Sequence, residues 1–183
     1  MSDDSQQHKQ PPSSDHPAEQ ISAAEFTAVY REYVQPLYRY LYSRVGRADL
    51  AEELTAQTFL AALEGLPRYR PGNFAGWLFT IARHKAADYF RRQPLAELDP
   101  QADYPGPDSD ALGALIQAEQ KQRLLASIAG LRENERELLR LRYAARLSFP
   151  QMAAVLGRGP EAVKKQHYRL LARLKHAMEA ADG

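Results

Sequence analysis

A run of lysine and arginine side chains near the C-terminus carries the clearest chemical signal in the sequence. Over residues 160–178 these cations alternate with apolar residues at helical spacing, so a helix would carry them together on its outer face. Lysine and arginine on such a face bind DNA phosphates and the edge of guanine. The residues predicted to contact duplex DNA are Glu161, Lys164, Lys165, Tyr168, Arg169 and Arg173.

The apolar side of the same stretch predicts how this helix packs. Its inward residues are expected to be Val163, His167, Leu170, Leu174 and Met178. Because His167 belongs to that stripe, it is interpreted as a partly buried histidine and not as a ligand.

A helix-turn-helix would hold the basic helix in place. Ser148 and Gln151 have the spacing of a capping box, which predicts that a first helix starts there. Gly157 and Gly159 then supply a tight turn, and Pro160 suits the first position of the second helix. Together these features favour binding in the major groove of DNA. The alternative interpretation is a solvated basic helix within an ordinary helical hairpin.

A second stretch, 68–92, combines aromatic and basic side chains. It holds six aromatic residues in twenty-five positions, with arginine and lysine between them. Such a surface suits unpaired bases, which stack on aromatic rings while cations follow the phosphates. The alternative is that these rings, above all Trp77, belong to a hydrophobic core.

The distribution of charge divides the chain into five segments. Residues 21–92 carry a net charge of +3 and residues 113–178 one of +8, whereas 93–112 is acidic, at −5, and contains four prolines. Clustered cations favour nucleic-acid binding through counterion release, although the whole chain is only +1. We expect a disordered tail over 1–20, two basic modules, a flexible linker over 93–112 and a short tail over 179–183.

Both modules show helical periodicity, so the predicted fold class is all-α, with two small helical domains joined by the linker. The elements expected in the first module are helices over 22–45, 49–63 and 73–92 and a loop over 66–72. The first helix would start at a capping box of Ser22 and Glu25 and be kinked or divided at Pro36. Its inward residues are expected to be Phe26, Val29, Tyr30 and Tyr33.

Several protein classes are excluded by what the sequence lacks. It has no cysteine, which rules out disulfides and thiolate metal sites and fits a reducing cytoplasm. No apolar run reaches the ~18 residues of a membrane span, and no signal-peptide layout occurs, so membrane insertion is not expected. The histidines do not have the spacing of metal ligands, and the sequence contains no phosphate-binding loop and no nucleophile elbow. We therefore expect no catalytic residue, metal or cofactor. Glu133, Glu135 and Glu137 are interpreted as a solvated helix face.

Three tracts connect these patterns. They are A-E-E-L-T-A-Q-T-F-L at 51–60, F-A-G-W-L-F-T-I-A-R-H-K-A-A-D-Y-F-R-R at 74–92, and L-R-E-N-E-R-E-L-L-R-L-R-Y at 131–143, ahead of the helix-turn-helix. Together they resemble the sigma-70 family, specifically its small extracytoplasmic-function (ECF) group. The module at 21–92 is similar to sigma domain two and the module at 113–178 to sigma domain four.

The resemblance implies a promoter-specificity subunit that binds core RNA polymerase, recognises the minus-35 and minus-10 elements and helps open DNA for transcription initiation. The polymerase contacts would be Asp49, Glu52, Glu53, Leu54 and Gln57. Contacts to the minus-10 element, including a base flipped from the opened strand, would be Arg68, Tyr69, Arg70, Asn73, Phe74, Trp77, Arg83, His84 and Arg91. The basic helix would bind the minus-35 duplex. An anti-sigma factor is a further partner that the family leads us to expect.

Some residues depart from the family pattern. Thr55 and Ala56 replace the end of its D-L-V-Q motif, and Gln57 stands where the family often has a carboxylate. Other departures are His84 for asparagine, Ala162 for threonine and Lys165-Gln166 for serine-arginine, and they predict an atypical minus-35 preference. Two other functions fit the same residues: a stand-alone helix-turn-helix regulator that binds duplex DNA only, and a helical adaptor without a DNA function.

Overall fold

The computed structural model describes residues 23–70, 72–92 and 122–179, and within these ranges it contains helices and no strand. The first part of the chain forms α1 (Ala23–Val45), α2 (Ala48–Gly65), the 3-10 turn η1 (Leu66–Arg68) and α3 (Phe74–Arg92). The second part forms a helix over 122–129, α5 (Glu133–Leu139), the π-helical turn η2 (Arg140–Ala144), α6 (Phe149–Leu156) and α7 (Pro160–Glu179). The predicted all-α class is confirmed. The predicted tail 1–20, the linker 93–112 and the Ser22 capping box lie outside the described residues.

The first module is a bundle of three helices around one core. Leu37, Tyr40 and Leu41 of α1 recur at helical spacing and are fully buried. They meet Leu78 and Phe79 of α3, which are also fully buried, and the Tyr40 and Phe79 rings pack edge to face at 5.5 Å. Apolar burial of this kind is the main favourable contribution to folding. Among the helices of the described ranges, none is long and apolar enough to cross a membrane.

Two details of α1 differ from the sequence prediction. Pro36 lies inside one uninterrupted helix, so it does not divide α1. Tyr30, predicted to point inward, is 45% exposed. Its ring lies 4.8 Å from that of Phe59 on α2, at the edge of the bundle. Tyr30 therefore covers the core from outside and does not belong to it.

The helix-turn-helix forms as its local signals predict. The Ser148 hydroxyl accepts a hydrogen bond from the Gln151 backbone N–H at 3.4 Å, and the Gln151 side chain accepts one from Ser148 N–H at 2.8 Å. These bonds satisfy two backbone donors that the start of α6 leaves free. Gly157 ends α6 with a φ of 63°, in the left-handed region that favours glycine. Pro160 then begins α7.

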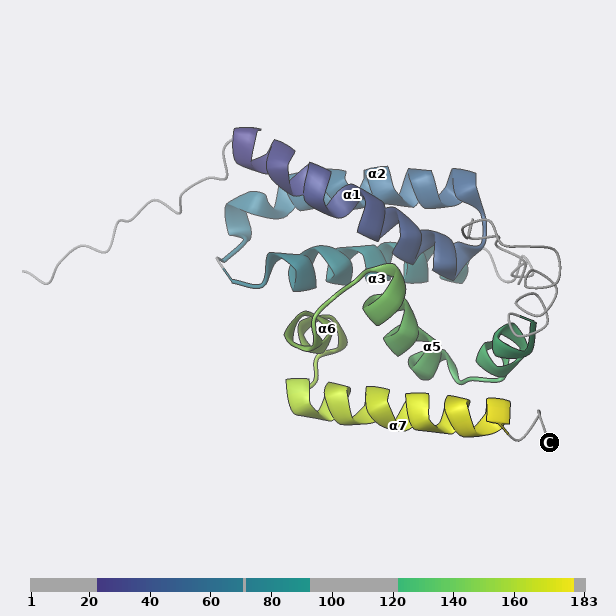
Figure 1. The fold of residues 1–183 in the computed structure, drawn as a ribbon. Helices are drawn as coiled ribbons and strands as arrows, with labels where there is room; N and C mark the ends of the chain where they lie inside the picture. Colours follow the sequence, from purple (N-terminus) through teal and green to yellow (C-terminus); the bar gives the residue numbers. More distant parts are fainter. Residues whose placement is uncertain (1–22, 71, 93–121, 180–183) are drawn as a thin grey trace, which may run out of the picture.

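The two modules lie against each other. Figure 1 shows α5 and α6 between α3 on one side and α7 on the other. The helices α3 and α6 approach closely at Gly76, where an added Cβ would lie 2.7 Å from the Cβ of Ala154. A side chain at this position would therefore force the helices apart, and glycine permits the contact.

Glu137 contradicts the prediction that it belongs to a solvated helix face. The residue is only 3% exposed and lies where α5 meets α1 and α3. Its carboxylate accepts hydrogen bonds from the Tyr40 hydroxyl and the Arg44 guanidinium, both at 2.7 Å. Burial, and then the neighbouring Glu137 carboxylate, raise the pKa of Tyr40 above its usual range. Tyr40 therefore stays protonated and acts as a donor.

Phe79→Ala should lower the free energy of unfolding by about 3–5 kcal/mol, because it opens a cavity beside Tyr40. Urea denaturation at neutral pH measures this loss. The control is Leu63→Ala, which truncates a side chain that is 46% exposed and should change stability by only about 0.5 kcal/mol. Equal losses in the two variants would contradict the described core.

Candidate nucleic-acid interface

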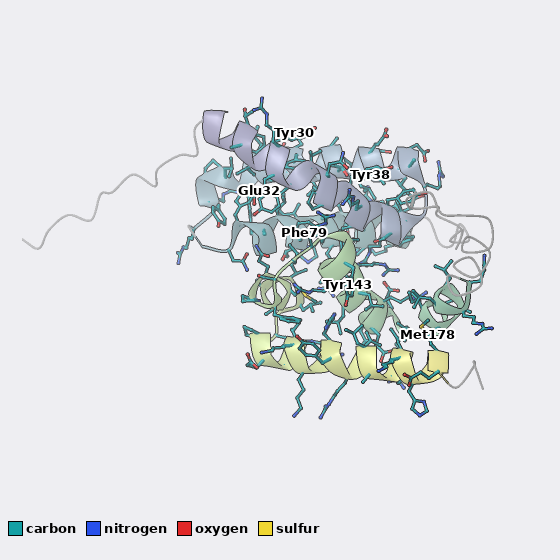
Figure 2. The ribbon with its side chains drawn as sticks, in the orientation of Figure 1. Tyr30, Glu32, Tyr38, Phe79, Tyr143 and Met178 are labelled. Carbon is teal, nitrogen blue, oxygen red and sulfur yellow. The ribbon has the colours of Figure 1, made fainter. Side chains whose placement is uncertain are left out.

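The outer face of α7 gathers five of the six residues predicted to contact duplex DNA. The positions turned inward and buried are Val163, His167, Leu170 and Leu174. The predicted contacts on the side opposite to these are exposed: Glu161, Lys164, Lys165, Tyr168 and Arg169. Arg173 is exposed as well, at the edge of this face. In Figure 2, long side chains project from α7 on the side away from the rest of the molecule. The face is thus accessible to a ligand as large as a DNA duplex.

Arg173, the sixth predicted contact, lies on the flank of α7. Its guanidinium donates a hydrogen bond to the Glu135 carboxylate of α5 at 2.6 Å. This bond, together with the hydrogen bond from the Arg132 backbone, lowers the pKa of Glu135. Arg173 therefore helps to join α7 to α5, whereas the exposed Lys165 side chain makes no ion pair with another residue of the described ranges. Two helical turns earlier on the same flank, Arg158 donates to the Gln166 side chain at 2.8 Å and joins the turn to α7.

His167 is buried among aromatic rings, as part of the packing of α7 on α6. The ring centroids of Phe149, Tyr143 and Tyr168 lie 5.4, 5.7 and 5.6 Å from its own. Neither ring nitrogen has a hydrogen-bond partner within the described ranges. Burial, and then the positive charge of Arg142, lower the pKa of His167. The interpretation of His167 as a packing residue is consistent with this environment.

An aromatic cluster occupies the start of α3 and the segment before it. The Tyr69 ring lies 4.7 Å from the ring of Trp77 and 5.5 Å from that of Phe74. All three residues are half-buried, so they support one another and also reach the surface. The buried hydroxyl of Tyr69 has no hydrogen-bond partner in the described part of the chain. The cluster thus combines a packing role with an accessible edge.

Four other residues predicted to contact the minus-10 element lie before α3 or along its length, and all four are accessible. Arg68, Arg70 and His84 are exposed. Arg91 is exposed too, and its guanidinium donates to the Asp88 carboxylate at 2.6 Å. These side chains can therefore meet a ligand without any movement of the backbone.

Asn73 and Arg83, also predicted to contact the minus-10 element, face the second module instead. The side-chain oxygen of Asn73 accepts from Gly76 N–H at 2.9 Å and caps α3, while its side-chain amide N–H donates to the Pro150 backbone carbonyl of α6 at 3.3 Å. The Arg83 guanidinium donates to the Val155 carbonyl at 3.4 Å. Both residues therefore join α3 to α6 in this structure.

The acidic face of α2 holds most of the predicted polymerase contacts. Asp49, Glu52 and Glu53 are exposed, and the Gln57 amide donates to Glu53 at 2.9 Å. A hydrogen bond from the Arg47 guanidinium lowers the pKa of Asp49. Leu54, the remaining predicted contact, is 3% exposed, and its side chain belongs to the core instead of the accessible face of α2.

An apolar residue that the sequence prediction missed extends this face. Leu60 is 59% exposed and follows Glu53 by two helical turns, which places it on the same side of α2. A shallow groove of about 480 Å³ runs beside the face, between α1 and α2, and Tyr38 and Phe59 are among its lining residues. The spacing of Leu60 from Glu53 was the signal that could have identified it.

Comparison with known proteins finds the same two units. The family models described as Sigma-70 region 2 and Sigma-70, region 4 match residues 29–94 and 121–174. The ECF RNA polymerase sigma factor BldN of Streptomyces coelicolor is 34% identical over 156 residues, which span 80% of this chain and 58% of BldN. The ECF RNA polymerase sigma factor ShbA of Streptomyces griseus is 34% identical over 166 residues, which span 80% of this chain and 84% of ShbA.

Two solved structures share the fold. The sigma factor RpoE in complex with the anti-sigma factor NepR, from Bartonella quintana, superposes with a TM-score of 0.65 at 20% identity and covers 86% of this chain and 98% of RpoE. CnrH in complex with the cytosolic domain of CnrY gives a TM-score of 0.61 at 23% identity and covers 87% of this chain and 90% of CnrH. Because the region 2 match lies outside the helix-turn-helix, a stand-alone duplex-binding regulator is not favoured.

His167→Phe should reduce the loss of stability on acidification. Because the pKa of His167 is lowered by folding, its imidazole takes up a proton more readily in the unfolded chain than in the folded chain as the pH falls below about 6.5. The free energy of unfolding should therefore decrease between pH 7 and pH 5 in the natural chain, and by less in the variant. Urea denaturation at the two pH values measures the difference.

The matched control is His176→Phe, which replaces an exposed histidine of the same helix. The two variants differ in burial and not in chemistry. If the His167 and His176 variants lose the same stability between pH 7 and pH 5, the buried ring is not the source of the effect.

Proposed function

The chain belongs to the sigma-70 family, in its ECF group, and is a promoter-specificity subunit of RNA polymerase; we propose that three of its surfaces carry this function. The surfaces are the outer face of α7, the aromatic cluster with its neighbouring cations at the start of α3, and the acidic face of α2. In this proposal the chain binds and positions other molecules in the cytoplasm and catalyses no reaction itself.

The outer face of α7 is assigned to the minus-35 duplex. The observation that supports the assignment is that α7 has two distinct sides. Lys165, Tyr168 and Arg169 are exposed on one side, and the other side is buried. A helix-turn-helix places such a face in the major groove. Lysine and arginine there contact guanine or phosphate, while Glu161 can accept a hydrogen bond from cytosine. Ala162 and Lys165 stand where the family usually has other residues and would tune the sequence preference.

The start of α3 is assigned to the minus-10 element. Arg68 and Arg70 supply exposed positive charge beside the Tyr69 and Trp77 rings. An unpaired base could stack on the accessible edge of this cluster, where aromatic stacking is worth about 1–3 kcal/mol per base. This combination favours an opened strand over a duplex.

The acidic face of α2 is assigned to core RNA polymerase. Glu52, Glu53 and Leu60 form a surface with negative charge around an exposed apolar side chain. Complementary charge of this kind guides association, and the apolar residue supplies contact area at the centre. An anti-sigma factor is proposed as a further partner. Of the two solved structures of similar fold, one is a complex of RpoE with the anti-sigma factor NepR, and the other is a complex of CnrH with the cytosolic domain of CnrY.

Lys165→Ala should weaken binding to a minus-35 duplex by about 1–3 kcal/mol, because it removes a cation from the groove-facing side of α7. Fluorescence anisotropy with a labelled promoter duplex and the polymerase holoenzyme measures the change. Lys175→Ala is the control: it removes an exposed lysine ten residues along the helix, about 15 Å away. A similar loss in both variants would argue against a specific reading face.

Charge reversal of Glu52 and Glu53 to lysine should weaken binding to core RNA polymerase at least about tenfold, and should leave the melting temperature within a few degrees of the natural value. Titration of labelled chain with purified core polymerase measures the affinity. The control is Glu64→Lys, which reverses an exposed acid in the last turn of the same helix. Undiminished binding by the Glu52/Glu53 variant would remove this face from the proposal.

A further inference from the structure

The flank of α7 that faces α5 fixes two arginine side chains in the same way. Gln166 and Arg173 are seven residues apart, which places them within about 20° of each other around α7 and about 10.5 Å apart along it. The Arg158 guanidinium donates to Gln166 Oε1 at 2.8 Å, and the Arg173 guanidinium donates to Glu135 Oε1 at 2.6 Å. We call these four residues the arginine edge.

In each pair of the arginine edge, the arginine is more accessible than the group that holds it. The Arg173 side chain is 59% exposed, whereas that of Glu135 is 16% exposed. Arg158 is exposed and Gln166 is half-buried. Glu135 is also fixed from a second direction, because its Oε2 accepts from the Arg132 backbone N–H at 3.1 Å, at the start of α5. The acceptors therefore belong to the scaffold, and the arginines reach solvent.

Both guanidinium groups retain donors for a further ligand. A guanidinium has five N–H donors in a fixed planar arrangement, which matches the oxygens of a phosphate. Within the described ranges, each of these two groups makes one hydrogen bond to another side chain. An arginine that is already held at one point also loses less side-chain freedom when it binds. The arginine edge is therefore suited to binding phosphate groups.

The position of the arginine edge on α7 indicates which part of a duplex it would meet. The major groove is about 12 Å wide, and a helix with its side chains is about 10–12 Å across. When Lys165 faces the base edges, the flanks of α7 must therefore face the sugar-phosphate walls of the groove. Arg173 lies about 80° around the helix from Lys165, on such a flank. Contacts to these walls position a protein on DNA without reading its sequence.

We propose that the arginine edge binds two phosphates of the minus-35 duplex, with Arg158 and Arg173 as the contacts and Gln166 and Glu135 as positioning residues. The proposal rests on the assignment of α7 to the minus-35 duplex. Because the two anchoring points lie about 10.5 Å apart along α7, each arginine contacts a phosphate of its own. Arg158 in the turn and Glu135 on α5 thus extend the duplex interface beyond α7.

Arg158→Gln and Arg173→Gln test the phosphate contacts. Fluorescence anisotropy with the polymerase holoenzyme compares a promoter duplex with one of equal length and scrambled minus-35 sequence. Each variant should weaken binding to both duplexes by the same factor, about fivefold at roughly 0.15 M salt, and should reduce the slope of log affinity against log salt by about 0.9. A loss confined to the promoter duplex, or an unchanged slope, would overturn the contacts.

The matched control is Arg31→Gln, the same change at an exposed arginine of α1. Figure 1 shows α1 and α7 on opposite sides of the molecule. The control should leave the salt slope unchanged. An equal reduction of the slope in Arg31→Gln would mean that only the total charge of the chain matters, and would overturn the arginine edge.

Gln166→Ala tests positioning without any change of charge. It should weaken duplex binding roughly two- to tenfold, because the freed Arg158 must then be ordered on binding. The same change should have no effect in the Arg158→Gln background. Equal losses in the two backgrounds, or no loss in either, would overturn the positioning role of Gln166.

Glu135→Gln tests the second pair, since it removes the charge and keeps an acceptor for the Arg132 N–H. Arg173→Gln should cost less affinity in the Glu135→Gln background than in the natural chain. A larger cost there would show that the carboxylate competes with phosphate, and would overturn its positioning role. If the natural holoenzyme binds the promoter and scrambled duplexes equally, the minus-35 assignment fails, and the salt slopes still decide whether the arginine edge binds phosphate.

Discussion

A carboxylate buried where three helices meet is the interaction on which the arrangement of the two modules depends. Taking the Glu137 charge out of water costs several kcal/mol unless donors replace the lost hydration. Tyr40 and Arg44 supply those donors from α1, with Arg83 of α3 and Arg140 nearby. The helices that supply these groups must keep their positions relative to one another for as long as the carboxylate is buried. The position of α6 on α3 follows from it, and so does the accessibility of the face of α3 that is proposed to bind the minus-10 element.

The helix-turn-helix could be predicted from the sequence because its determinants are local. Ser148, Gln151 and Gly157 act within a few residues of their own position, and the structure shows the expected capping box and left-handed turn. The helical spacing of apolar residues in α7 likewise predicts that Lys165 is exposed and His167 is buried, and this prediction needs no information about any other element. Local hydrogen bonds and helical periodicity were therefore sufficient for the fold class and for the outer face of α7.

Predictions failed where burial depends on segments far apart in the chain. Glu137 resembles the exposed acids Glu133 and Glu135 by type, and it is buried because Tyr40 and Arg44, more than ninety residues away, lie over it. Leu54 was assigned to a partner by its place in a motif, although its side of α2 faces the bundle core. Neither outcome could be derived from helical spacing alone, because spacing defines a face and not what covers it.

The central claim is that one chain reads two separate promoter elements for RNA polymerase, one as duplex and one as opened strand. Transcription from a library of random promoters, with purified core polymerase and this chain, tests it most directly. The account predicts that active promoters share two sequence blocks at a fixed spacing, upstream of a common start site. Active promoters that share a single block, or an absence of transcription above the level of core polymerase alone, would contradict the account.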